Sequence, residues 1–130
     1  MPKKVLIAED DAAIRRLASE CLSRRGHEIV QAADGVQACA VAEAEKPDLI
    51  LLDLLLPRRD GYTVLLFLRS RPETRGIPVL LLSGEPPEEQ EEIARTLGAD
   101  GYLPKPFTPT GLIQAVEAAL QARSLGMEVR

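Results

Sequence analysis

Acidic side chains occur at two places where a short apolar run ends. Glu9, Asp10 and Asp11 follow the run at 5–8, and Asp53 stands among leucines and isoleucines in "LILLDLLLP". Because an unpaired carboxylate costs several kcal/mol to remove from water, such a run keeps one only at its exposed end or for chemistry. Clustered carboxylates without histidine or thiolate suit a hard cation, and Mg²⁺ in particular where places remain for water and phosphate.

Two further polar groups follow later apolar runs. Ser83 ends "VLLLS", and Lys105 comes directly after "GYLP". A hydroxyl and an ammonium beside a metal-binding acidic cluster are groups used for phosphoryl transfer to a carboxylate, because the cation and the lysine offset charge while Asp53 attacks. A simpler interpretation is that a serine or lysine is solvent-exposed and that acids cap helices, as we expect of Asp11 before the helix from Ala12.

These residues belong to an alternation of strand and helix patterns. Residues Ile14, Leu17, Ala18, Cys21 and Leu22 follow the spacing of one helix face. Five such strand and helix units predict an α/β fold with a parallel sheet covered on both faces, whose ligands bind beyond the carboxyl ends of the strands. The expected strands are 5–8, 28–32, 49–52, 78–82 and 101–103.

Turn and cap residues separate these elements. Gly26 and Gly98 are expected where helices end, and Asp60-Gly61 before the third helix. Pro86-Pro87, followed by four glutamates, predicts the start of a fourth helix, and Thr108-Pro109 the start of the last.

Length and composition fit one globular domain, expected at 1–123, with 124–130 as a tail or the start of a linker. The 130 residues include 45% hydrophobic and 28% charged side chains. A net charge of -4 and 3% aromatic residues disfavour direct nucleic-acid binding and favour a protein partner. No segment approaches the ~18 apolar residues of a membrane span, so we expect no membrane association and a cytoplasmic location.

Three residue types are expected to be without a functional role. Cys21 and Cys39 each lie in a helical apolar pattern, which favours two core residues over a disulfide or metal pair. His27 is expected in a surface loop. The arginines are expected to be solvated charges, namely Arg15, Arg16, Arg58, Arg59, Arg69 and Arg71.

From about residue 3 to residue 122, the chain resembles the receiver domains of two-component response regulators, of the chemotaxis-regulator type. Four segments carry the resemblance, in that family's order and spacing: "VLIAEDD", "PDLILLDLLLPRRDG", "PVLLLSGE" and "GADGYLPKPF". The resemblance implies a flavodoxin-like doubly wound parallel sheet with strand order 2-1-3-4-5. That order would place the first strand beside the third and bring their acids together.

The resemblance also assigns roles to individual residues. It implies Asp53 as the phosphoacceptor, and Glu9, Asp10, Asp53 and the carbonyl of Leu55 around Mg²⁺. It further implies that Ser83 bonds the phosphoryl group, that Lys105 faces it, that Tyr102 changes rotamer, and that the Lys105-Pro106 bond is cis.

The implied function is a phosphorylation-activated switch rather than an enzyme, one that catalyses only its own phosphoryl transfer and dephosphorylation. The donor would be a histidine kinase or a phosphotransfer protein. The changed surface would lie on the fourth helix, fifth strand and fifth helix, roughly 88–122, and would bind a downstream protein or a fused output domain. A phosphorylation-dependent homodimer is compatible with this function.

Three departures from the commonest family pattern leave the reactive groups in place. Leu56 replaces a frequent methionine, and Gly84 a frequent alanine, which we expect to loosen the switching loop. Leu55 puts an apolar side chain near the attacking water, so we expect an altered rate of phosphate loss.

Three other functions remain open on the sequence. A Mg²⁺-dependent aspartyl phosphatase would carry a second aspartate where this chain has Leu55, and a flavin-binding electron carrier would want a Ser/Thr/Gly-rich loop where it has Glu9-Asp10-Asp11. A docking module that is never phosphorylated would not need Asp53, Ser83 and Lys105 together.

Overall fold

A computed structural model describes residues 3–84, 92 and 95–124 of the chain. Within these residues, five parallel strands form one sheet in the order β2-β1-β3-β4-β5. The strands are β1 (Lys4–Ala8), β2 (Glu28–Ala32), β3 (Leu49–Asp53), β4 (Val79–Ser83) and β5 (Gly101–Pro104). The expected fold class and strand order are therefore confirmed, with strand ends within one residue of those expected from the apolar runs.

Four helices connect and flank the strands in the described part of the chain. They are α1 (Ala12–Arg24), α2 (Gly35–Glu45), α3 (Gly61–Ser70) and α5 (Pro109–Ser124). The helix expected after Pro86-Pro87 falls mostly on residues 85–91 and 93–94, which lie outside the described residues. The expected tail also lies outside them, except for Ser124, which ends α5.

An aspartate begins each of the first three helices. Asp11 accepts hydrogen bonds from two amides of α1, Asp34 from Gln37 N of α2, and Asp60 from Thr63 N of α3. Such a cap satisfies amides that the helix itself cannot bond and contributes about 1 kcal/mol. At the other end of α1, Gly26 has the positive φ of 90° that favours glycine after a helix.

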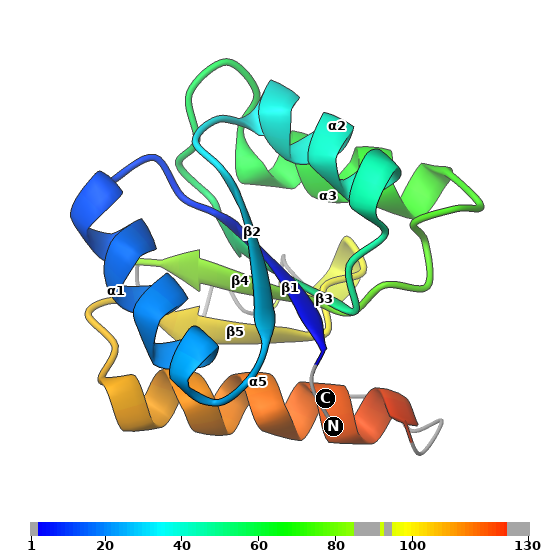
Figure 1. Cartoon of the computed structure of the whole chain (residues 1–130). Coiled ribbons are helices and arrows are strands. Elements are labelled where there is room, and N and C mark those ends of the chain that lie inside the picture. Colours follow the sequence, from blue (N-terminus) through cyan, green and yellow to red (C-terminus); the bar gives the residue numbers. More distant parts are fainter. Residues whose placement is uncertain (1–2, 85–91, 93–94, 125–130) are drawn as a thin grey trace.

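The helices cover both faces of the sheet and create two cores (Figure 1). On one face, α2 and α3 pack their buried residues against Leu6, Ile50 and Leu52. On the other, α1 and α5 cover the alternate residues of the same strands, including Val5, Ile7, Leu49 and Leu51. Because β3 and β4 are buried along their whole length, their continuous apolar runs follow from cover on both faces.

The two cysteines lie on opposite faces of the sheet. Cys39 is buried in the core under α2 and α3, and the half-buried Cys21 packs against the core under α1 and α5. Both thiols are free, and burial raises the pKa of the Cys39 thiol. Their expected role as core residues agrees with this placement.

The expectation for His27 was wrong, because its imidazole is buried where the connection from α1 to β2 packs against α5. Lys3 N donates to His27 Nδ1 at 3.3 Å, and His27 Nε2 lies 3.3 Å from Glu117 Oε2. Arg25 binds the same carboxylate at 3.0 and 2.8 Å. Glu117 therefore joins α5 to the end of α1.

Half of the arginines expected to be solvated are instead partly buried and bonded, namely Arg15, Arg59 and Arg69. Arg69 shows why: its guanidinium donates to Gly98 O, Ile77 O and Asp100 Oδ2, each at 2.8 Å. Carbonyls at the ends of elements need donors, and a long arginine in the right place supplies several.

Candidate phosphoacceptor and metal site

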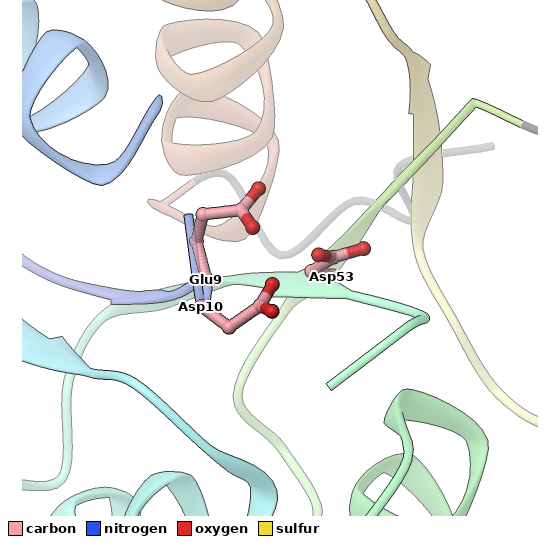
Figure 2. A group of neighbouring side chains, drawn as sticks. All are labelled: Glu9, Asp10 and Asp53. Atoms are coloured by element: carbon pink, nitrogen blue, oxygen red, sulfur yellow. The ribbon is translucent and has the colours of Figure 1, made fainter. Parts of the chain in front are cut away.

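The strand register brings the acidic residues together at one edge of the sheet. Ala8 pairs with Leu52, so Glu9, the next residue after β1, lies beside Asp53 at the end of β3. Glu9, Asp10 and Asp53 each offer a carboxylate oxygen, and these three atoms lie within 4.8 Å of one another. Figure 2 shows the three side chains at the neighbouring ends of the two strands. Glu9 and Asp53 are buried and Asp10 is exposed, so the cluster has an open side.

Lys105 brings a positive charge to this cluster. Its Nζ lies 2.5 Å from Glu9 Oε1 and 3.2 Å from Asp53 Oδ2. The Lys105-Pro106 peptide is cis, and Lys105 N donates to Ser83 O at 2.8 Å. Burial acts to lower the pKa of Lys105, but the carboxylates of Glu9 and Asp53 outweigh it and raise the pKa above its ordinary value. The ammonium therefore stays charged at neutral pH.

Glu9 is the acid of this group whose pKa is clearly raised. Its pKa is raised to about 7, mainly by burial and also by Asp53, although the Lys105 ammonium and the Asp11 amide act to lower it. Lys105 thus offsets only part of the cost of ionising Glu9. At neutral pH and without a metal ion, this carboxyl is divided between its protonated and ionised forms.

The cluster fits Mg²⁺ in its chemistry. Glu9 Oε1 is buried and has no hydrogen-bond partner among the described residues apart from its ion pair with the Lys105 ammonium. A buried oxygen without a hydrogen bond, next to two more carboxylates, is an arrangement that a cation would stabilise. All the donors are oxygens, which hard divalent cations prefer.

Asp53 is held at the end of β3 with one oxygen engaged by its own loop. Its side chain is 5% exposed, and Oδ1 accepts from Leu55 N at 3.1 Å. Behind the strand end, Gly61 comes so close that a Cβ there would lie 2.5 Å from Asp53 O. The Leu55 side chain is 66% exposed, and the role of its carbonyl as a metal ligand stays a prediction.

Ser83 and Tyr102 lie on the two strands next to β3. Ser83 ends β4 one residue beyond Leu82, which pairs with Asp53, and it is buried. The half-buried Tyr102 packs on the core under α2 and α3, and its hydroxyl donates to Ser83 O at 3.3 Å. The structure therefore brings the sequence-predicted residues to one edge of the sheet, while their separate roles stay predictions.

Comparison with known proteins decides which family this arrangement represents. The family model described as "Response regulator receiver domain" matches residues 5–117. The chain is a response regulator receiver domain. The resemblance found in the sequence is thereby confirmed.

Solved receiver structures share the fold at moderate sequence identity. A putative response regulator from Chloroflexus aurantiacus superposes with a TM-score of 0.88 at 32% identity, covering 93% of this chain and 99% of that one. Chemotaxis response regulator CheY4 of Vibrio cholerae gives 0.86 at 32% identity, covering 90% and 98%.

Curated relatives of this receiver domain include longer proteins. Transcriptional regulatory protein PdtaR of Mycobacterium tuberculosis is 42% identical over 121 residues, which are 92% of this chain and 58% of PdtaR. The alkaline phosphatase synthesis transcriptional regulatory protein PhoP of Bacillus subtilis is 39% identical over 93% of this chain and 50% of PhoP. The chain thus spans about half the length of these relatives. In its described part, no helix is both long and apolar enough to cross a membrane.

Sequence reasoning missed Arg15 in this receiver domain. Its Nη1 donates to Glu9 O at 2.7 Å and lies 3.5 Å from Asp10 O, and its Nε donates to Gln31 Oε1 at 3.1 Å. One signal was present: helical side chains point back toward the helix N-terminus, so an arginine in the first turn of α1 can reach the loop that precedes it.

Proposed function

We propose that the protein is a phosphorylation-activated signalling switch that accepts a phosphoryl group on Asp53 in a Mg²⁺-dependent reaction. The observation that carries this proposal is the convergence of Glu9, Asp10 and Asp53, with Lys105 Nζ 3.2 Å from Asp53 Oδ2. The donor is a histidine kinase or a phosphotransfer protein, the usual source for this family. We place the receiver at 1–123 and the protein in the cytoplasm.

Each residue has a defined task in the transfer. An oxygen of Asp53 attacks the phosphorus of a phosphohistidine, the O–P bond forms, the P–N bond breaks, and its electron pair returns to the imidazole nitrogen. Lys105 offsets the charge on the transferred oxygens, and the Ser83 hydroxyl donates to one of them. Glu9, Asp10, Asp53 and the Leu55 carbonyl would hold Mg²⁺, which would supply further positive charge for the transferred oxygens.

The phosphoryl group then changes the binding surface predicted for the expected fourth helix, β5 and α5. It adds roughly 1.5 to 2 negative charges. One charge-assisted hydrogen bond to Ser83 contributes about 1.5–3 kcal/mol, whereas a switch from 1:99 to 99:1 needs about 5.5 kcal/mol. The rest of the free energy that shifts the switch therefore comes from Lys105, the metal and the repacking of Tyr102. A downstream protein or an output domain of a longer chain reads the altered surface.

Intact-mass measurement after incubation with Mg²⁺ and a small acyl phosphate tests the proposal. We expect one added phosphoryl group on the wild type, stable in acid and removed by hydroxylamine, and none on Asp53→Asn or in excess chelator. Glu20→Gln, which removes an exposed acid from α1, serves as the control and should be phosphorylated normally. Continuous phosphate release from phosphoesters would instead indicate a phosphatase and would overturn the proposal.

A further inference from the structure

Arg15 connects three parts of the molecule beside the acidic cluster. It lies in the first turn of α1, and its guanidinium reaches back to the carbonyls of Glu9 and Asp10. A second nitrogen of the same guanidinium donates to the Gln31 side chain on the edge strand β2. The residue is half-buried, whereas its neighbour Arg16 is exposed.

The bonded carbonyls lie where regular structure cannot supply their partners. Glu9 and Asp10 stand after the last residue of β1 and before Asp11, the cap of α1. The helix bonds begin with the Asp11 carbonyl, which accepts from Arg15 N at 2.9 Å. Among the described residues no backbone amide bonds the two preceding carbonyls, and Arg15 supplies them with a side-chain donor.

We propose that Arg15 is a positioning residue for the metal site: by fixing the Glu9 and Asp10 backbone against Gln31, it aims both carboxylates at the cation. This inference rests on the proposed function, since it concerns the same Mg²⁺ site. Groups that orient metal ligands commonly change metal affinity by about 10-fold to 100-fold when removed. Arg15 acts on the backbone that carries two ligands at once.

A positioning role and a purely electrostatic role of Arg15 predict opposite effects of its removal on Mg²⁺ affinity. Arg15 is a cation near the site, so by Coulomb repulsion alone its removal would tighten Mg²⁺ binding. If it positions the ligands, its removal loosens the loop and weakens binding. Arg16→Ala removes the same charge from the next residue of α1 without removing a bond to the loop, and is the matched control.

The test is a Mg²⁺ titration of the full ¹⁵N-labelled chain followed by NMR, with amide hydrogen exchange recorded without metal. For Arg15→Ala we expect Mg²⁺ affinity about tenfold below that of Arg16→Ala. The Asp10 and Asp11 amides should exchange faster than in the control, while the amides of β3 are unchanged. Arg15→Lys keeps the charge and one donor, so it should recover part of the affinity.

Equal affinities of Arg15→Ala and Arg16→Ala, or tighter binding by Arg15→Ala, would overturn the inference. If Arg15→Ala does not fold, Gln31→Ala tests the same anchor from the exposed edge strand. It should weaken Mg²⁺ binding and speed exchange of the Asp10 amide, and wild-type values for both would be contrary evidence. A wild type that shows no Mg²⁺ response would refute the metal site itself, and the exchange rates would still test whether Arg15 anchors the loop.

Discussion

Replacing Glu9 by glutamine should change how the stability of the protein depends on pH. The pKa of Glu9 is raised in the folded protein from 4.5 to about 7, mainly by burial. At about 1.4 kcal/mol per pKa unit, this corresponds to about 3 kcal/mol lost from the free energy of unfolding above pH 7. Because the folded pKa is the higher one, the contribution of the protonated group is complete below pH 4.5 and is lost as pH rises through 7.

Glutamine does not titrate, so the difference between variant and wild type should itself depend on pH. In chelator at pH 8, we expect Glu9→Gln to be more stable than the wild type by about 1–3 kcal/mol, because loss of the contact with Lys105 offsets part of the gain. At pH 5 this advantage should disappear. Urea unfolding at both values measures the difference, with Glu20→Gln as the control for losing an exposed acid.

Magnesium should reverse the order of stability. A cation bound to the ionised carboxylates stabilises the folded wild type at pH 8, and should stabilise Glu9→Gln less, since that variant lacks one ligand. If the difference in stability between wild type and variant is the same at pH 5 and pH 8, with or without Mg²⁺, the pKa of Glu9 is not raised by folding.

Four further substitutions test other parts of the site. Gly61→Ala should lower the free energy of unfolding by about 2 kcal/mol or more, because its Cβ would meet the Asp53 carbonyl at 2.5 Å; Gly76→Ala, which meets nothing within 4 Å, should be nearly neutral in the same urea experiment. Leu55→Asn should change the lifetime of the phosphorylated protein, measured by intact mass over time, and an unchanged lifetime would contradict a role for this exposed side chain. Ser83→Ala and Tyr102→Ala should each give partial activation, measured as partner affinity after phosphorylation; full activation of Ser83→Ala would contradict a shared switching energy.

The sequence was informative about elements and about which residues end them. Apolar runs bounded by glycine, proline and aspartate predicted every described strand, because burial on both faces leaves a continuous apolar pattern. Asp11 was also correctly predicted as a cap. Strand order could not be derived from the pattern, since β3 and β4 have similar apolar runs, and it came from the family resemblance instead.

Long polar side chains were the part that pattern reasoning could not place. Arg15, Arg69 and His27 are bonded to groups that become neighbours only after folding, some of them distant in sequence. Apolar periodicity predicts which residues face the core, but it does not predict which groups a long, flexible arginine side chain will contact. The meeting of Glu9, Asp10, Asp53 and Lys105 at one edge of the sheet was therefore predicted, whereas the supporting contacts of Arg15 were missed.

The position of α5 has a consequence for synthesis of the chain on the ribosome. Leu112, Val116 and Ala119 are made long after Val5 and Ile7, yet they pack in the same core and cover them. Until α5 leaves the exit tunnel, this face of the nascent sheet is covered by α1 alone, and its remaining apolar surface is open to chaperones or to aggregation. The receiver fold is therefore completed only after α5 has been translated.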